Sequence, residues 1–266
     1  MLTLRDGDVL PLHENVLETY LDDLEPLRGI VGDAAVVGIA RGAHGAAELT
    51  RLSHRIVRFL VTELGFRTLA IEASSAVVDR IDAWLQEGTG EIETIATVAH
   101  PWWRATEFIA VLRWMREYNR AHPTEPLRLV GLETATSDMD EQERYIATTI
   151  LHWIEHTGHK VVYWSGSHSA VGHCRAVTWV PADEARPGSR NAGSLLREHL
   201  GPRYRSLGLT FHHGAVRWQG QIVQIPPAPA DFTDTFLDLP TSALHLLDLT
   251  GGDAASAIAG TALRCA

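Results

Sequence analysis

The sequence contains very little cysteine. Only Cys174 and Cys265 occur among 266 residues, and no C-x-x-C motif is present. Two cysteines can form at most one disulfide within the chain, which is too few to hold a domain of this size together. This cysteine usage favours a reducing compartment, and we therefore expect a cytoplasmic protein.

Long apolar runs and an excess of positive charge are also missing. No window approaches the roughly 18 consecutive apolar residues that a membrane-spanning helix needs. The N-terminal segment MLTLRDGDVLPLHENV lacks the basic start and the apolar core of a signal peptide. A formal net charge of −10 repels the phosphates of nucleic acids and anionic lipids. We therefore expect neither a nucleic acid nor a membrane as a partner.

Several common catalytic and nucleotide-binding motifs are absent as well. The sequence has no G-x-x-x-x-G-K-[ST], G-x-G-x-x-G, G-x-S-x-G or H-E-x-x-H pattern. The stretch HWIEHTGH (152–159) spaces three histidines at i, i+4 and i+7, but no nearby cysteine or carboxylate has ligand spacing. We interpret this stretch as a solvated helix face. We expect no metal and no cofactor.

What the sequence does contain is an alternation of apolar, strand-like runs with amphipathic helical patterns. Such alternation is typical of an α/β fold with an open, mainly parallel sheet and helices on both faces. We expect one domain over residues 1–266, and the least periodic stretch, 175–193, predicts a loop near a site. Strands are predicted at 34–40, 67–73, 127–133, 159–166, 204–211 and 243–250, helices at 14–30, 46–64, 76–87, 91–99, 106–121, 140–158 and 194–201, and a small C-terminal hairpin at 215–225.

Polar and titratable side chains gather where the predicted strands end. Ligands of open parallel sheets bind beyond the carboxyl ends of the strands. Groups that share such a region perturb one another's pKa values. We therefore expect a shared site, and the candidates in chain order are Arg41, His44, Glu72, Glu133, Ser165, His168 and His212.

His44 and Glu72 are the strongest of these candidates. His44 lies between Gly42 and Gly45, and glycines let the backbone turn tightly and approach a ligand closely. Histidine titrates near neutral pH and suits proton transfer; the alternative is that His44 only caps the next helix. Glu72 ends an otherwise apolar strand, where a carboxylate needs a partner. A catalytic role and a structural ion pair both remain open for Glu72.

A second cluster of candidates lies in HPWWRATE (100–107). Adjacent aromatic and charged groups would form the wall of a pocket for an organic substrate. We expect Trp102 to belong to the core. The predicted wall residues are Trp103, Arg104 and Glu107.

These pieces, taken in order, resemble the erythromycin esterase-like family. The first family signature is a strand, then Gly-Glu-x-Thr-His-Gly, a helix and a strand that ends in Glu-Ala. The corresponding stretch here reads VVGIARGAHGAAEL…FLVTELGFRTLAIEA. Further matches are PWWRATEFIAVLRWMREYN, LRLVGLE, KVVYWS, SLLREHLGPRYRSLGLTF and LHLLDL. The resemblance implies that His44 is a general base that activates water against a macrolide lactone and that Glu72 is the family's strand-two glutamate.

The chain departs from the family pattern at several positions. Arg41 replaces the motif glutamate, and Ser53 replaces an arginine on the following helix. The family's Trp-Ala-His-Asn-x-His reads WSGSHS at 164–169, so both family histidines are missing and His168 lies between their places. The long helical insertion after the third strand is reduced to TATSDMDEQE (134–143). We therefore expect a remodelled site on the same scaffold and do not infer antibiotic resistance.

The function that we expect is acid–base catalysis on a small-molecule or peptide substrate, such as a natural product, with His44 as the general base. The reaction is either hydrolysis of an ester or lactone, or a cyclisation, addition or elimination, which needs proton transfer and a shaped pocket. The alternative is a binding protein that kept the fold and lost the chemistry. A metal-dependent hydrolase is a third hypothesis, and the oligomeric state stays open.

Overall fold

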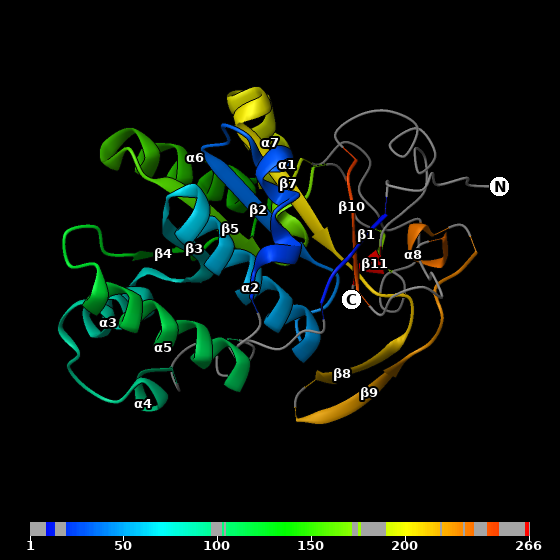
Figure 1. Cartoon of the computed structure of the whole chain (residues 1–266), viewed down its shortest axis with the longest axis horizontal. Coiled ribbons are helices and arrows are strands. Elements are labelled where there is room, and N and C mark those ends of the chain that lie inside the picture. The colour runs from blue at the N-terminus through cyan, green and yellow to red at the C-terminus, as the bar shows by residue number, and fades with distance from the viewer. Residues whose placement is uncertain are drawn as a thin grey trace.

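A five-stranded parallel sheet forms the centre of the molecule (Figure 1). The computed structural model of the chain describes residues 9–13, 20–96, 103, 105–171, 175–176, 190–218, 220–230, 232–236, 244–249 and 264–265. Every pairing within the sheet is parallel, which confirms the predicted sheet. The strand order is β4–β3–β5–β2–β7, with β2 at Val36–Arg41, β3 at Phe66–Ser74, β4 at Arg128–Glu133, β5 at Lys160–Ser165 and β7 at Tyr204–Leu209.

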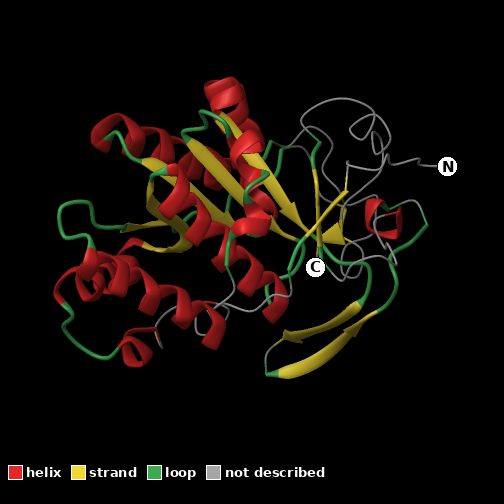
Figure 2. Ribbon diagram, in the orientation of Figure 1, coloured by secondary structure: helices red, strands yellow, loops and turns green. Residues whose placement is uncertain are grey.

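Helices cover both faces of this sheet, as predicted (Figure 2). From β2 to β3 and from β3 to β4, each new strand lies nearer the β4 edge of the sheet. From β4 to β5 and from β5 to β7, each new strand lies nearer the β7 edge. Right-handed crossovers place their helices on opposite faces when the direction reverses. One face carries α2 (Ala47–Leu64), α3 (Ser75–Glu87) and α5 (Thr106–Ala121), and the other carries α6 (Met139–Thr157) and α7 (Ala192–Leu200).

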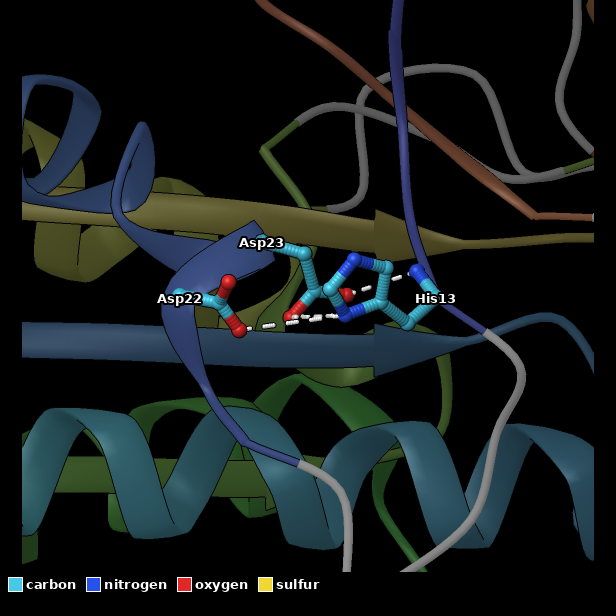
Figure 3. Close-up of side chains that lie close together, drawn as sticks. All are labelled: His13, Asp22 and Asp23. Atoms are coloured by element: carbon cyan, nitrogen blue, oxygen red, sulfur yellow. Dashed lines mark hydrogen bonds and ion pairs between the residues drawn. The ribbon is translucent and has the colours of Figure 1, made fainter.

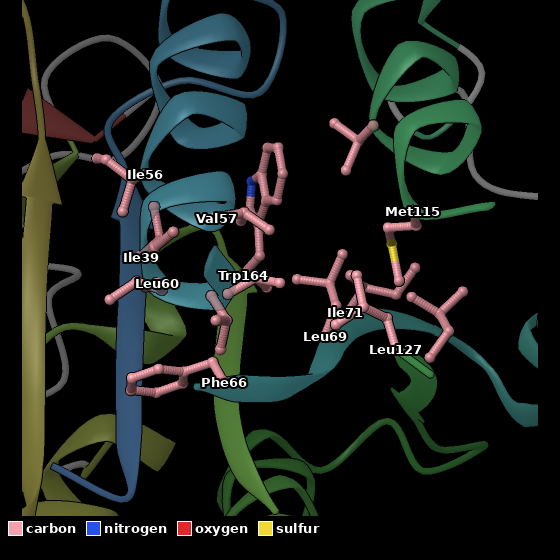
Figure 4. Close-up of a cluster of buried hydrophobic side chains, with 14 of the residues drawn as sticks. Ile39, Ile56, Val57, Leu60, Phe66, Leu69, Ile71, Met115, Leu127 and Trp164 are labelled. Atoms are coloured by element: carbon pink, nitrogen blue, oxygen red, sulfur yellow. The ribbon is translucent and has the colours of Figure 1, made fainter. Parts of the chain in front are cut away.

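The two faces bury two separate apolar cores. In β5, Val162 and Trp164 join the core under α2 and α5, whereas Val161 and Tyr163 join the core under α6 and α7. Figure 4 shows the first core, where Trp164 lies among side chains such as Val57 of α2. Successive side chains of a strand point to opposite faces, so a strand covered on both faces reads as a continuous apolar run. This explains why the predicted strands show no polar alternation.

The helices of the sheet layers end where their sequences predict. The residues after α2 and α6 are Gly65 and Gly158, with φ of 72° and 70°. This left-handed conformation favours glycine and closes the last helical turn. Asp138 begins α6 by accepting a hydrogen bond from the backbone N–H of Glu141 at 2.9 Å. The helix α4 (Ile92–Ala96) agrees with the helix predicted at 91–99 as far as the chain is described, and residues 97–99 lie outside the described ranges.

The ends of the chain differ from the predictions. The helix expected at 14–30 is interrupted: a 3-10 turn at Asp22–Leu24 precedes α1 (Leu27–Val31), and residues 14–19 are outside the described ranges. Pro26 separates the two pieces, because proline disfavours helical continuity before it. The last predicted strand is only His245–Leu247 (β10), and it pairs antiparallel with Val9–Pro11 (β1), apart from the central sheet.

The remaining small elements flank the sheet. The predicted hairpin is confirmed as β8 (Gly214–Trp218) and β9 (Gln221–Ile225), and it projects from the body of the molecule (Figure 1). Arg175–Ala176 (β6) pairs with Arg264–Cys265 (β11), and α8 spans Thr233–Phe236. The predicted loop at 175–193 therefore begins in β6 and ends in α7, and its residues 177–189 lie outside the description. Within the described ranges, no helix has both the length and the apolar character needed to cross a bilayer.

We expect a buried histidine to make the fold sensitive to acid. His54 is 3% exposed between α2 and α5, and its ring meets Trp114 edge-on at 5.6 Å. Neither ring nitrogen has a hydrogen-bond partner among the described residues. Burial, and then Arg58, lowers the pKa of His54 from 6.5 to about 4. The unfolded chain therefore binds a proton before the folded chain does, and stability falls as the pH falls from 6.5 toward 4, by up to about 3 kcal/mol.

The variant His54→Phe removes this titration and keeps the aromatic contact with Trp114. We expect its free energy of unfolding to fall less than that of the wild type between pH 7 and pH 4.5, measured by urea denaturation at both pH values. The exposed His156→Gln on α6 serves as the control and should follow the wild type. Equal pH slopes for His54→Phe and the wild type would show that His54 is not buried in neutral form.

Candidate functional site

The turn after β2 places His44 against the turn after β5. The helix α2 begins at Ala47 with Ala46 as its N-cap, so His44 is not the capping residue. Its Nδ1 lies 3.3 Å from Nη2 of Arg41. A Cβ added to Gly166 would lie 2.8 Å from His44 Nε2, so the ring packs directly on the Gly166 backbone.

A neighbouring glycine fixes the same turn from the other side. The carbonyl of Gly45 accepts a hydrogen bond from the backbone N–H of Arg217 in the β8–β9 hairpin at 3.0 Å. A Cβ at Gly45 would lie 2.0 Å from the carbonyl oxygen of Arg217. Only glycine permits this approach. The hairpin therefore holds the His44 turn in place.

Glu72 of β3 is the carboxylate of the site. Its side chain is 15% exposed. Its Oε2 accepts the backbone N–H of Gly166 at 3.4 Å, and its Oε1 lies 3.5 Å from the hydroxyl of Tyr163, which donates. Burial raises the pKa of Glu72, and this effect outweighs the opposing influence of His168, the Gly166 N–H and Arg41. Gly166 thus contacts both His44 and Glu72, which brings the two strongest candidates together.

His168 approaches Glu72 from a 3-10 turn at Ser167–Ser169. Its Nδ1 lies 2.5 Å from Oε1 of Glu143, and its Nε2 lies 4.0 Å from Oε1 of Glu72. The second oxygen of Glu143 accepts the backbone N–H of Ala192, the first residue of α7, at 2.6 Å. The imidazole is therefore oriented by one buried carboxylate and directed toward a second one.

Glu143 is a residue that the sequence reasoning missed. It lies on α6, and a signal for it exists in the pattern of that helix. Glu143 precedes the buried Ile146, Ala147 and Ile150 at spacings of three, four and seven. An acidic residue on the apolar side of an amphipathic helix needs a buried partner.

Arg41 is buried beside His44 rather than presented to a substrate. It is 4% exposed, and its guanidinium lies 5.6 Å from the ring of Trp103 and 5.3 Å from that of Trp164. Its Nη1 donates to the hydroxyl of Thr50 at 3.3 Å. Burial lowers the pKa of Arg41 to about 10, against the influence of Glu72. The side chain therefore stays protonated at neutral pH.

Two further predicted substrate contacts prove to be internal. Trp103 is 1% exposed and packs on Phe108, with ring centroids 4.6 Å apart, so it supports Arg41 and forms no exposed wall. Ser165 is fully buried, and its hydroxyl bonds to the carbonyl of Gly166 at 3.0 Å and to the hydroxyl of Ser169 at 2.6 Å. Both residues shape the site from inside the core.

The remaining predicted residues do not join this cluster through the contacts described for them. Glu107 pairs with Arg51 at 3.3 Å. Glu133 is exposed at the last position of β4. His212 follows β7, with its ring edge-on to that of His213 at 5.2 Å. Arg104 lies outside the described residues.

A different group of potential metal ligands lies near the N-terminus (Figure 3). Nδ1 of His13 lies 3.8 Å from Asp22 and 3.9 Å from Asp23, and no other such group occurs within the described ranges. Asp23 is bonded to the fully buried Arg55 at 2.5 Å. Although burial raises the pKa of Asp23, the bonds from Arg55 and from the His13 N–H lower it below its usual value. The guanidinium of Arg55 already neutralises the carboxylate of Asp23. We therefore interpret His13, Asp22 and Asp23 as a structural contact with α2 and not as a cation site.

The solvated face predicted at 152–159 is confirmed for two of its three histidines. The rings of His152 and His156 lie 4.8 Å apart and are exposed. The Nδ1 of His159 instead lies 3.2 Å from the hydroxyl of Thr68. The three histidines therefore do not converge on one point, and the interpretation as a solvated face holds for the first two.

Comparison with known proteins identifies the family. The family model described as erythromycin esterase matches residues 61–142 and 133–264. The chain belongs to the erythromycin esterase family. Two curated members from Escherichia coli are similar to it: erythromycin esterase type II, 32% identical over 124 residues, and type I, 25% identical over 137 residues. These alignments cover 47% and 51% of this chain but only 29% and 32% of the two relatives, so the chain spans about a third of their length.

Solved structures share the fold at low sequence identity. A succinoglycan biosynthesis protein superposes with a TM-score of 0.79 at 18% identity, covering 94% of this chain and 86% of the other. A Bacillus cereus protein gives 0.71 at 19% identity, covering 94% and 85%. A mutant of the erythromycin esterase EreC in its open conformation gives 0.66 at 14% identity, covering 86% of each chain.

Within this erythromycin esterase fold, the turn after β5 is rebuilt around small residues. The family pattern places histidines at the positions of Gly166 and Ser169. Gly166 leaves the space that the ring of His44 occupies. The hydroxyl of Ser169 is bonded to Ser165 inside the turn. In this chain the ring of His44 therefore packs on the small residue at this strand end, and His168 lies between the two positions.

The variant Gly166→Ala tests this packing. Its methyl group would lie 2.8 Å from Nε2 of His44, so the ring must move. We expect the free energy of unfolding to fall by about 1–3 kcal/mol, measured by urea denaturation, together with a shift of the His44 ring signals in NMR spectra. Gly29→Ala in α1 is the control, because a Cβ there meets nothing within 4 Å. It should stabilise by up to about 1 kcal/mol. Unchanged His44 signals in Gly166→Ala would contradict the contact.

Proposed function

We propose that this chain is a hydrolase-like, acid–base enzyme that cleaves an ester or lactone of a small organic molecule, with His44, Glu72 and His168 as the groups that transfer protons or stabilise charge. One observation carries the proposal. Gly166 contacts the ring of His44 and donates its backbone N–H to Glu72, and Nε2 of His168 lies 4.0 Å from Oε1 of Glu72. One buried carboxylate and two imidazoles thus gather around the turn that follows β5.

The chemistry of hydrolysis needs what this cluster offers. One group must accept a proton from water as the oxygen attacks the carbonyl carbon, and another must stabilise the negative charge on the carbonyl oxygen. A carboxylate whose pKa is raised by burial exchanges a proton closer to neutral pH than an exposed one. The protonated leaving group then departs as an alcohol. Cyclisation, addition or elimination would use the same proton transfers without water.

The short connection after β4 bears on the substrate. Only residues 134–138 separate β4 from α6. The long helical insertion that the family resemblance implies at this place is therefore absent between these elements. This supports a substrate other than a macrolide that is enclosed by such an insertion, and we propose a natural-product ester or lactone of a different shape.

The proposal is tested with a panel of p-nitrophenyl esters, simple lactones and a macrolide lactone. We expect at least one substrate to turn over and the activity to survive a chelator. The variants His44→Ala, Glu72→Gln and His168→Gln should each lower kcat/KM by about 10²–10⁴, because each removes a proton-transferring or charge-stabilising group. The exposed His156→Gln serves as the control and should keep the wild-type value.

Three results would contradict the proposal. A panel compound that binds, by calorimetry, with the same affinity to the wild type and to His44→Ala but is not turned over would indicate a binding protein. Turnover that all three variants retain would place the chemistry elsewhere in the chain. Loss of turnover on chelation would favour a metal-dependent hydrolase instead.

Glu143 provides a separate test, because it acts through His168. The variant Glu143→Gln keeps the shape of the side chain but no longer holds the imidazole with a carboxylate. We expect kcat to fall by about 10–100-fold with KM little changed and the pH–rate profile to shift. Glu155→Gln, an exposed position on the same helix, is the matched control. A pH profile identical to that of the wild type would reduce Glu143 to a structural role.

A further inference from the structure

The contact between Arg41 and His44 determines where the proton of the imidazole sits. Nη2 of Arg41 lies 3.3 Å from Nδ1 of His44. A guanidinium has only N–H donors and no acceptor. In this hydrogen bond Nδ1 must therefore be the acceptor and carry no proton. A neutral ring with an unprotonated Nδ1 has its proton on Nε2.

We propose that Arg41 is a positioning residue that holds His44 neutral with its proton on Nε2, so that His44 donates a hydrogen bond to the carbonyl oxygen of the substrate and is not the general base. This inference rests on the proposed function for its catalytic part. It assigns to Arg41 a role different from the substrate contact that the sequence predicts. It also revises the predicted role of His44.

Several contacts keep the guanidinium of Arg41 in place for this role. It lies against Trp103 and Trp164, and its Nη1 donates to Thr50. Only 4% of Arg41 is exposed. With its pKa at about 10, the side chain remains a cation at neutral pH. A doubly protonated His44 would place a second cation beside Arg41, and its Nδ1–H would face an N–H of the guanidinium. Both effects are unfavourable in a buried site.

The direction of Nε2 fits a donor. The ring packs on Gly166 through Nε2, and the backbone N–H of the same residue is bonded to Glu72. An N–H at this place lies among groups that surround a reacting carbonyl, where preorganised donors stabilise developing negative charge. A glutamate at position 41, as in the family pattern, would accept a hydrogen bond from Nδ1–H and leave Nε2 unprotonated as a base. With Arg41 at this position, the side chain donates to Nδ1 of His44, and the proton of the ring is on Nε2.

The proton acceptor then comes from Glu72 and His168. Water gives a proton to this pair as its oxygen bonds to the carbonyl carbon, while the carbonyl oxygen gains negative charge and accepts the hydrogen bond from His44. The bond to the leaving oxygen breaks next, and that oxygen takes the proton back from the pair. The products are a carboxylic acid and an alcohol, and His44 keeps its proton throughout.

The first test reads the tautomer directly and needs no substrate. Two-bond ¹H–¹⁵N correlation spectra of protein labelled at the histidine rings distinguish a protonated nitrogen from an unprotonated one, and His44→Gln identifies the His44 signals. We expect His44 of the wild type to carry its proton on Nε2 at neutral pH. A majority population with the proton on Nδ1, or with both nitrogens protonated, would overturn the inference.

Two variants test the role of Arg41. Arg41→Met keeps an apolar stem against the tryptophans but has no donor, and we expect Nδ1–H to appear on His44. Arg41→Glu should shift the proton to Nδ1 more completely. The half-exposed Arg51→Met on α2 is the control and should leave the tautomer unchanged. Persistence of Nε2–H in a folded Arg41→Met would show that another group sets the tautomer.

Activity gives an independent test of the donor role. Glutamine keeps an N–H donor but cannot take up a proton, whereas alanine has neither property. If His44 is a donor, His44→Gln should retain at least about tenfold more kcat than His44→Ala, since loss of such a donor costs about 10²–10³ in kcat. An equal loss of kcat in the two variants would indicate that His44 is a general base and would overturn its proposed role as a donor.

These measurements separate the inference from the proposed function. A proton on Nε2 of His44 in a protein that turns over no compound of the panel would uphold the tautomer and reject the hydrolase. Hydrolysis by a wild type whose His44 carries its proton on Nδ1 would uphold the hydrolase and reject the role of Arg41.

Discussion

The backbone at Gly166 is approached from two sides, and the candidate site depends on that approach. The ring of His44 lies where a side chain at this position would begin, and the N–H of Gly166 holds the carboxylate of Glu72. These two contacts join the ends of β2, β3 and β5, which are neighbours in the sheet. A side chain at Gly166 would displace the ring of His44 from its place on this turn.

The site gathers several buried charges at the carboxyl ends of the central strands. Arg41 and Glu143 are 4% and 7% exposed, and Glu72 is mostly buried. Charges removed from water cost free energy unless hydrogen bonds and opposite charges compensate them. Arg41 is compensated by two aromatic rings, Thr50 and the field of Glu72, and Glu143 by His168 and the first N–H of α7. Such arrangements are typical of functional sites, where perturbed ionisation is part of the chemistry.

The surrounding elements support these strand ends. The hairpin β8–β9 fixes the turn that carries His44, through its close contact with Gly45. The helix α6 carries Glu143, and α7 presents the backbone N–H that anchors it. The core beneath α2 and α5 contains Trp103 and Trp164, which hold Arg41. Each layer of the fold thus contributes to the orientation of one of the two imidazoles.

The sequence by itself determined the parallel sheet, the helices on both faces and the strand ends at which Arg41, His44, Glu72 and His168 lie. Apolar runs, helical periodicity and terminal glycines are local signals, so they survive in a single sequence. The partners of those residues were decided only by the tertiary structure. Glu143 reaches His168 across 25 residues of chain, and Trp103 and Trp164 converge on Arg41 from α5's N-terminal side and from β5. Contacts between distant segments depend on crossover direction and packing, which no local pattern records. Arg41 is only three residues from His44, but the tryptophans against which its guanidinium packs, Trp103 and Trp164, come from distant segments, so only the fold showed this guanidinium as the donor to Nδ1 of His44.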